Sequence, residues 1–291
     1  MAADDTQDCQ SIEQLLQLGG QVLQQAGIEA PRREARLLLQ HALGRSAEQM
    51  LSLSRQDKVE AGRYLTLLAR RARHEPFAYI TGRKGFWTLE LEVSPASLVP
   101  RADTETLIAT VLEHVPDRQK ALSVLDLGTG TGCILLAVLA EYINAWGVGI
   151  DINPQAAVLA RGNAVQCALG DRAHILAGRW SDALAANVRF DIVLSNPPYI
   201  PTRDLADLMP EVREHEPCTA LDGGPDGLDA YRDLCSRLPA LLNEDGLAFF
   251  EIGIGQAEAL TALAQAGGLQ VVAVVPDLAG ISRVVVLRRV V

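Results

Sequence analysis

The sequence predicts an α/β protein with a doubly wound, mostly parallel sheet of seven strands, preceded by a small all-helical domain and a β-hairpin linker. From residue 103 onward, short apolar runs typical of buried strands alternate with segments of helical spacing. Residues 11–75 show helical spacing only, and residues 85–99 alternate apolar and polar side chains. We therefore expect three regions, which span residues 1–80, 81–102 and 103–291.

The helical region contains three segments with apolar residues three and four positions apart. The second segment begins at Pro31, a residue suited to the first turn of a helix. The third ends in a basic run, Arg70, Arg71 and Arg73, which we expect to lie on a solvated helix face. The apolar positions that support these helices are Ile12, Leu15, Leu16, Val22 and Leu23; Leu37, Leu38 and Leu39; and Tyr64, Leu65, Leu67 and Leu68.

Seven apolar runs in the remainder of the chain have the length and composition of strands. Helical segments separate the earlier runs, which favours parallel pairing because a parallel connection needs a long crossover. Open sheets of this kind bind ligands at the carboxyl ends of their strands. The predicted strands are residues 122–127, 147–151, 172–177, 190–195, 246–251, 270–275 and 283–289.

A glycine-rich turn follows the first predicted strand. The strand leads into Gly128, Gly130 and Gly132, and a helical segment begins at Cys133. Glycines let the backbone approach a ligand closely, and the first turn of a helix offers unpaired N–H groups. The dinucleotide-binding pattern would need its third glycine where Cys133 stands, and the Gly-Lys-Ser/Thr of a P-loop is missing. The turn therefore predicts a different nucleotide cofactor.

The next strand ends in a carboxylate. Asp151 closes the apolar run that starts at Trp146, and Pro154 is suited to the first turn of the helix that follows. In nucleotide-binding α/β proteins, a carboxylate at this position accepts hydrogen bonds from the ribose hydroxyls. We therefore expect Asp151 to bind the ribose of the cofactor.

The fourth strand stops abruptly at Asn196-Pro197-Pro198-Tyr199. Two consecutive prolines neither continue a ladder nor enter a helix interior. The chain therefore forms a rigid edge that carries an amide side chain, free backbone carbonyls and an aromatic ring. Such an edge suits a planar group with N–H donors, such as an amide or an exocyclic amine. A tight loop without a ligand is the alternative.

In this order, the segments Asp126–Gly132, Asp151 and Asn196–Tyr199 resemble the class I S-adenosylmethionine-dependent methyltransferases. Further segments narrow the resemblance to the release-factor glutamine methyltransferases, also called the PrmC or HemK family. Two positions depart from that family, since Ala102 stands where proline is common and Ser282 where an acidic residue is usual. The further segments are His74–Gly82, Phe86-Trp87, Leu98–Glu105 and Ala220–Gly227.

The resemblance implies S-adenosyl-L-methionine as the cofactor and S-adenosyl-L-homocysteine as its product. It places Asp126 near the methionine ammonium or beneath the glycine turn, and Trp180 against the adenine, although both residues also suit purely structural roles. Asn196, Pro197 and Tyr199 would be catalytic and, with Pro198, would bind the substrate. The residues implied at the cofactor are Asp126, Gly128, Thr129, Gly130, Thr131, Gly132, Asp151, Trp180 and Asn196.

The family methylates the side-chain amide of the glutamine in the Gly-Gly-Gln motif of peptide-chain release factors. The amide nitrogen is a weak nucleophile because its lone pair is delocalised, so the site must orient it; Asn196 and the Pro197 carbonyl would accept its N–H groups. Residues 1–80 would help to dock the partner protein. Two alternatives remain open: a glutamine of a ribosomal protein, or a DNA adenine flipped onto the same edge.

The charge distribution disfavours a nucleic acid as the direct partner. The net charge is −10, and all of this negative charge falls after residue 101, where a phosphate backbone would meet repulsion. The five scattered cysteines predict reduced thiols, and neither a signal peptide nor an apolar membrane span is apparent. We expect a monomeric cytoplasmic protein. We also expect no metal, because the candidate ligands lack zinc-site spacing; these are Glu211, Glu214, His215, Glu216 and Cys218.

Overall fold

The computed structural model describes residues 9–290, which form two compact units. One unit contains the chain up to Gly82 together with the segment Pro210–His215. The other contains Arg83–Met209 and the chain from Glu216 onward. The segment Pro210–His215 lies outside the range predicted for the helical region. Within residues 9–290, no helix combines the length and apolar character that crossing a membrane requires.

The first unit is built from short helices around an apolar core. The side chain of Ser11 accepts a hydrogen bond from the Gln14 N–H and thereby caps the first helix. Pro31 begins the second helix, and Gly44 ends it in the left-handed conformation. The buried Tyr64 hydroxyl donates to the Leu15 carbonyl at 3.1 Å. The helices are α1 (Ile12–Gln25), α2 (Pro31–Leu43), α3 (Ala47–Leu51), α4 (Gly62–Arg71) and α5 (Phe77–Thr81).

Two predictions for this unit need correction. It is not entirely helical, because β1 (Cys9–Ser11) pairs antiparallel with β2 (Lys58–Glu60). These three-residue strands are too short to show an alternating pattern. Arg71 does not lie on a solvated helix face either, since it is only 5% exposed and forms ion pairs with Glu34 and, at 2.8 Å, with Glu211. Glu211 belongs to the short helix α9 (Pro210–Arg213), so this ion pair holds the segment 210–215 within the first unit.

The second unit begins with the predicted hairpin. Strand β3 (Arg83–Phe86) pairs antiparallel with β4 (Leu89–Glu92). The backbone N–H of Trp87, in the turn, donates to the Glu105 carboxylate at 2.9 Å. Glu105 lies in the first turn of α6 (Glu105–His114), which follows the 3-10 turn η1 (Ala102–Thr104). The hairpin is thereby attached to the helix that leads into the main sheet.

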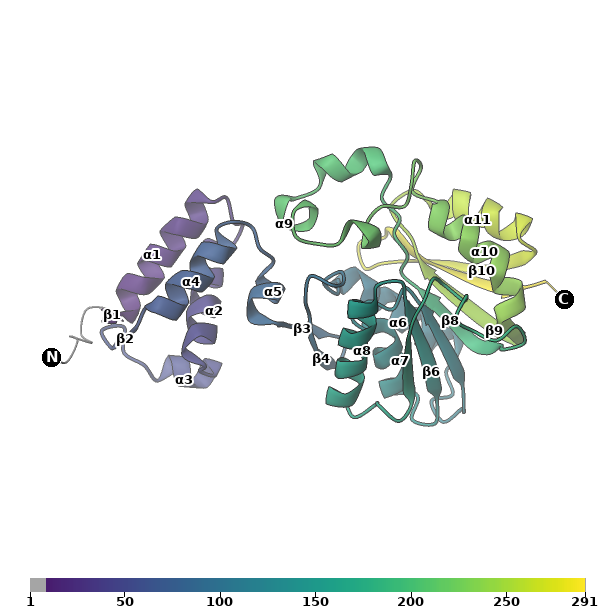
Figure 1. Cartoon of the computed structure of the whole chain (residues 1–291), viewed down its shortest axis with the longest axis horizontal. Helices are drawn as coiled ribbons and strands as arrows, with labels where there is room; N and C mark the ends of the chain where they lie inside the picture. The colour runs from purple at the N-terminus through teal and green to yellow at the C-terminus, as the bar shows by residue number, and fades with distance from the viewer. Residues whose placement is uncertain (1–8, 291) are drawn as a thin grey trace. The chain divides into compact units, whose positions relative to one another are not determined.

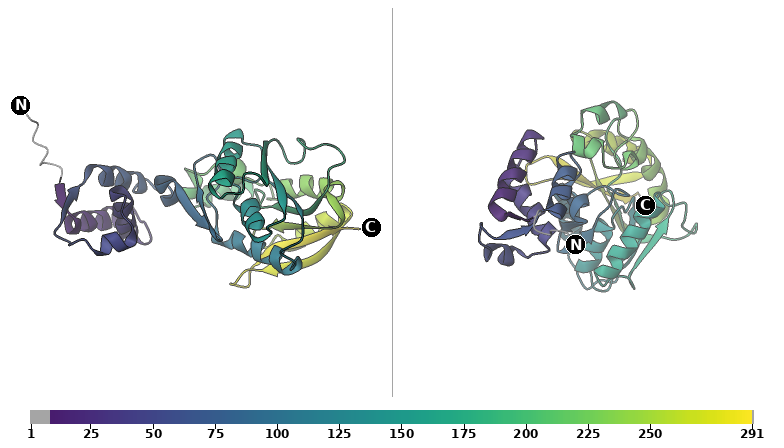
Figure 2. Two further views of the ribbon diagram at one scale, coloured as in Figure 1. Left: turned by 90° about the horizontal axis from the view of Figure 1, so that it is seen from below. Right: turned by 60° about the vertical axis from the view of Figure 1, so that its left-hand side comes forward.

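The predicted seven-stranded, mostly parallel sheet is confirmed, in the order β10-β11-β9-β8-β5-β6-β7. Among the strands of this sheet in residues 9–290, β11 runs opposite to all the others, which share one direction. It lies with β10 at one edge of the sheet, drawn in yellow in Figure 2. The strands are β5 (Ser123–Leu127), β6 (Trp146–Asp151), β7 (Ala173–Ala177), β8 (Phe190–Ser195), β9 (Leu242–Glu251), β10 (Leu269–Pro276) and β11 (Ser282–Arg289).

Helices cover both faces of this sheet (Figure 1). One face packs against α6, α7 (Cys133–Glu141) and α8 (Pro154–Gln166), and the other against α10 (Asp229–Leu241) and α11 (Ala257–Ala266). Successive strand residues alternate between the two cores, because side chains along a strand point to opposite faces. Phe249 lies in the first core and Phe250 in the second.

The strand order reverses between β5 and β8. From β5 the chain proceeds through β6 to β7 on one side, and from β8 through β9 on the other. The loops at the carboxyl ends of β5 and β8 therefore diverge and leave a crevice, which is where open α/β sheets bind their ligands. The predicted glycine turn and the Asn-Pro-Pro-Tyr edge follow these two strands.

Candidate active site

The glycine turn between β5 and α7 is held in a conformation that glycine adopts without strain. Gly128, Gly130 and Gly132 have φ angles of +79°, +56° and +83°. The backbone N–H groups of Gly128 and Thr129 both donate to the Ile150 carbonyl, at 2.9 and 3.0 Å. The turn is thus fixed to the neighbouring strand β6, and Gly132 caps the start of α7.

Asp126 lies beneath this turn and is completely buried. Its Oδ2 accepts a hydrogen bond of 2.6 Å from the Thr129 hydroxyl. Burial raises the pKa of Asp126 to about 7, although the Thr129 hydrogen bond opposes the shift. The hydrogen bond to Thr129 links Asp126 to the glycine turn.

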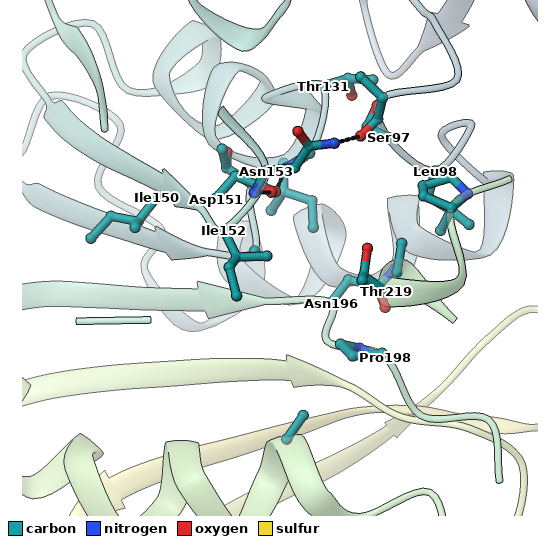
Figure 3. Close-up of a pocket in the computed structure, with 18 of the residues that line it drawn as sticks. Ser97, Leu98, Thr131, Ile150, Asp151, Ile152, Asn153, Asn196, Pro198 and Thr219 are labelled. Atoms are coloured by element: carbon teal, nitrogen blue, oxygen red, sulfur yellow. Dashed lines mark hydrogen bonds between the residues drawn. The ribbon is translucent and has the colours of Figure 1, made fainter. Parts of the chain in front are cut away.

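Asp151 connects the turn to the start of α8. Its Oδ2 accepts from the Gly130 N–H and its Oδ1 from the Asn153 N–H, both at 2.8 Å. Burial raises the pKa of Asp151, while these two backbone donors act to lower it. The Asn153 side chain donates to the Ala96 carbonyl at 2.8 Å and so ties the segment around Ser97 to this wall (Figure 3).

A pocket of about 460 Å³ opens above these residues, in the size range of small-molecule sites. It joins the glycine turn, the end of β6 and the Asn-Pro-Pro-Tyr edge, and Figure 3 shows Asp151, Ile152 and Asn196 around it. Asp126, Gly132, Pro197 and Tyr199 are not among its lining residues. The predicted site residues that do line it are Gly128, Thr129, Gly130, Thr131, Asp151, Trp180, Asn196 and Pro198.

The pocket has an apolar wall near the glycine turn. Trp180 lines it, and a Cβ atom placed on Gly128 would lie 3.6 Å from the Trp180 ring. Ile152, which directly follows Asp151, also lines the pocket and is 61% exposed. An exposed isoleucine next to a carboxylate suits a flat ring bound beside a ribose, because one side is apolar and the other accepts hydrogen bonds.

At the opposite end, Asn196 follows β8 and lines the pocket next to Pro198. Its Nδ2 donates to the Thr104 hydroxyl at 3.2 Å. Pro197 is buried behind it. The Tyr199 ring packs against the core under α10 and α11, and the Tyr199 carbonyl accepts from Gln256 Nε2 at 2.9 Å. Burial raises the pKa of Tyr199 to about 12, so its hydroxyl stays protonated near neutral pH.

Several residues of the site were not expected from the sequence. Thr104, Ile152 and Arg101 line the pocket, and Glu251 lies buried at the carboxyl end of β9, near Asn196. Arg101 forms an ion pair of 2.6 Å with Glu216, whose side chain is 1% exposed. The sequence did contain a signal for Glu251. It is a polar residue at the end of an apolar run, and Asp151 and Asn196 follow the same pattern.

The acidic run at 211–218 is engaged in ion pairs. Its carboxylates pair with arginines, Glu211 with Arg71 and Glu216 with Arg101. Across residues 9–290, no group of three or more potential metal ligands comes together.

Comparison with known proteins agrees with this architecture. A family model described as the PrmC N-terminal domain matches residues 14–82, and one described as the methyltransferase small domain matches residues 102–210. A release factor glutamine methyltransferase from Caulobacter vibrioides is 46% identical over 266 residues, which cover 90% of this chain and 91% of that protein. A protein of the same name from Rhodospirillum rubrum is 45% identical over 282 residues, or 94% of this chain and 84% of that protein.

A solved methyltransferase structure from Pyrococcus furiosus has the same type of fold. Its TM-score is 0.50 at 14% identity, over 78% of this chain and 98% of that chain. The fold and the pocket at the crevice therefore define a class I S-adenosylmethionine-dependent methyltransferase. More narrowly, the chain belongs to the release factor glutamine methyltransferase family.

Proposed function

We propose that this protein transfers a methyl group from S-adenosylmethionine to the side-chain amide nitrogen of the glutamine in the Gly-Gly-Gln motif of peptide-chain release factors. The observation that carries the proposal is the position of Asn196. Its amide lines the same pocket as the glycine turn and Asp151, so a cofactor and a substrate amide would meet there. The identity to proteins named for this reaction supports the same substrate.

The residues present fit S-adenosylmethionine. The Asp151 carboxylate retains free lone pairs for the ribose hydroxyls, since each of its oxygens accepts one backbone N–H. Trp180 and Ile152 offer an apolar surface to the adenine, and the bare backbone of Gly128 and Gly130 leaves room for close approach. When bound, the cofactor supplies a methyl group on a positively charged sulfur.

The chain's own contribution to the reaction is to orient the substrate amide. Asn196 Oδ1 and the Pro197 carbonyl are proposed to accept the two amide N–H groups, which turns the nitrogen lone pair toward the methyl donor. These acceptors stabilise the positive charge that develops on nitrogen before one N–H proton is lost to solvent. No strong base is required, because alkylation makes the nitrogen much more acidic. Proximity supplies most of the acceleration, with effective molarities of ~10⁵ M and above.

The remaining predicted residues keep supporting roles in this proposal. Asp126 holds the glycine turn through Thr129, and Thr131 and Gly132 complete the turn at the start of α7. Pro198 forms the pocket wall beside the substrate. Tyr199 is proposed to contact the amide, although in this structure its ring packs against the core under α10 and α11 and does not line the pocket.

The first unit is proposed to dock the release factor. Its match to the PrmC N-terminal domain and its own apolar core support a separate binding module, for which we keep the proposed range 1–80. A short Gly-Gly-Gln peptide would lose these contacts, so we expect a whole release factor to be the better substrate. The net charge of −10 supports a protein partner over a nucleic acid.

Mass spectrometry of an unmethylated release factor tests the proposal. After incubation with the protein and S-adenosylmethionine, we expect one added methyl group. A release factor with alanine in place of the Gly-Gly-Gln glutamine should gain none. Methylation of that variant, or of ribosomal protein or DNA in place of the intact release factor, would overturn the proposed substrate.

A further inference from the structure

The two ends of the Asn196 side chain have opposite hydrogen-bonding character, since Oδ1 accepts and Nδ2 donates. The proposed function requires Oδ1 to face the substrate amide, which presents N–H donors. If the Asn196 amide turned over, donors would face donors, and the substrate nitrogen would lose an acceptor. The site therefore needs a device that fixes this amide in one orientation.

The structure holds such a device behind Asn196. Asn196 Nδ2 donates to the Thr104 hydroxyl at 3.2 Å. Burial raises the pKa of the nearby Glu251 carboxyl group, and hydrogen bonding to Thr104 and, more weakly, to Asn196 opposes that shift. Register explains the meeting, because Ser195 on β8 pairs with Phe250 on β9, and Asn196 and Glu251 are the next residues along these parallel strands.

The carboxylate gives this chain of hydrogen bonds a direction. An ionised carboxylate only accepts, so the Thr104 hydroxyl must point its proton toward Glu251. The Thr104 oxygen then offers its lone pairs to Asn196 Nδ2, in agreement with the observed contact. With Nδ2 held on the protein side, Oδ1 is left for the substrate in the pocket.

Fold stability alone does not account for Glu251. It is 2% exposed, and its Oε2 has no hydrogen-bond partner within residues 9–290. An unsatisfied buried acceptor costs ~1–3 kcal/mol, so its presence calls for a function. Glu251 is not among the lining residues of the pocket, so it acts through its neighbours and not on the substrate.

We propose that Glu251 is a positioning residue, which acts through Thr104 to hold the Asn196 amide in the orientation that methyl transfer requires. This inference rests on the proposed function, because it assigns a role within that reaction. Glu251→Gln should weaken the hold on the Asn196 amide. A glutamine amide can also donate a hydrogen bond, so the Thr104 hydroxyl could then point its proton toward Asn196. Thr104→Val should do the same by removing the connecting hydroxyl.

The inference also predicts a pH dependence. Burial raises the pKa of Glu251 to about 7, against the hydrogen bond from Thr104 and the charge of Arg283. Below that pH the carboxyl group is protonated and can donate a hydrogen bond. The Thr104 hydroxyl then no longer has to point its proton toward Glu251. Activity should therefore fall as the pH drops through about 7. The titratable groups coupled to this carboxyl are Asp103, Cys133, Tyr199, Tyr231 and Arg283.

The test compares kcat, KM for a release factor, and cofactor Kd between pH 6 and 9 for the wild type and the variants. For Glu251→Gln and Thr104→Val we expect kcat to fall roughly tenfold or more, with KM and Kd nearly unchanged, as for interactions made mainly in the transition state. The acid limb near pH 7 should disappear in Glu251→Gln. Thr104→Ser should retain activity, because it keeps the hydroxyl. Glu258→Gln, at an exposed position of α11, is the matched control.

Two results would overturn the inference. One is wild-type kcat and an unchanged pH profile in Glu251→Gln. The other is a lower kcat that keeps the acid limb, which would indicate a merely structural role. If Glu251→Gln does not fold, Thr104→Val decides, since wild-type kcat in that variant also contradicts the inference. Failure of the proposed function is distinct, because the wild type itself would then transfer no methyl group to a release factor.

Discussion

The backbone N–H of Gly130 donates to Asp151 Oδ2 at 2.8 Å, and this bond joins the glycine turn after β5 to the carboxylate at the end of β6. The two regions proposed to contact the cofactor are therefore one hydrogen-bonded unit. A change in the Asp151 carboxylate should disturb both the proposed ribose contact and the conformation of the turn.

Asp151→Asn should weaken cofactor binding. The variant loses the charge that favours ribose hydroxyls, and its amide nitrogen cannot accept from the Gly130 or Asn153 N–H. Charge-assisted hydrogen bonds contribute ~1.5–3 kcal/mol, so we expect the Kd for S-adenosylmethionine to rise about ten- to a hundredfold. Isothermal titration calorimetry measures the change, with the exposed Asp171→Asn as control. Equal affinity in Asp151→Asn would contradict the ribose assignment.

Gly132→Ala should destabilise the fold. The residue has a φ of +83°, and an added Cβ would lie 3.2 Å from Leu136 and 3.3 Å from Ala160. We expect the free energy of unfolding to fall by ~1–3 kcal/mol, as measured by urea titration. Gly162→Ala is the matched control, because its Cβ would meet nothing within 4 Å and it lies within α8. That variant should gain ~0.5–1 kcal/mol. Similar effects at both positions would contradict the account of the turn.

The ion pair between Arg101 and Glu216 should contribute more to stability than an exposed pair. Arg101 lines the pocket, and the Glu216 carboxylate is buried, so their attraction is only partly screened. A double-mutant cycle with Arg101→Met and Glu216→Gln should give a coupling energy of ~1–3 kcal/mol. The exposed pair Arg83–Glu90 on the hairpin should give below ~1 kcal/mol in the same cycle. Equal coupling energies would mean that burial of Glu216 adds nothing.

Asp126 should make stability depend on pH. Its pKa is raised from 3.8 to about 7 in the folded state, so the folded protein binds a proton that the unfolded chain has released. The free energy of unfolding should therefore fall as pH rises between these values, by up to ~1.4 kcal/mol for each pH unit. Asp126→Asn removes this contribution. The free energy of unfolding of the variant, relative to that of the wild type, should thus be higher at pH 8 than at pH 5. If urea titrations give the same difference at both pH values, Asp126 does not hold a proton in the folded protein.

Much of the fold could be predicted because local patterns determine it. The strands of the main sheet have apolar side chains on both faces, and each predicted run coincides with an observed strand to within a few residues. The glycine turn, Asp151 and Asn196 each stand where an apolar run ends, so their meeting at the carboxyl edge followed from parallel pairing. The helices of the first unit were visible from their apolar spacing for the same reason.

Long-range pairings were not predictable from such patterns. Arg71 and Glu211 are 140 residues apart, and no local signal distinguishes a buried arginine from a solvated one. The strands β1 and β2 form only through their mutual pairing. Glu251 was within a predicted strand, but its contact with Asn196 depends on the register between β8 and β9, which the sequence does not specify.

The most direct test of the account is a crystal structure of the protein with S-adenosylhomocysteine and an unmethylated release factor. We predict that Asn196 Oδ1 lies ~2.8–3.2 Å from the side-chain nitrogen of the Gly-Gly-Gln glutamine. That nitrogen should face the cofactor sulfur, and the ribose hydroxyls should contact Asp151. A glutamine held away from Asn196, or one that faces Asn196 Nδ2, would contradict the account.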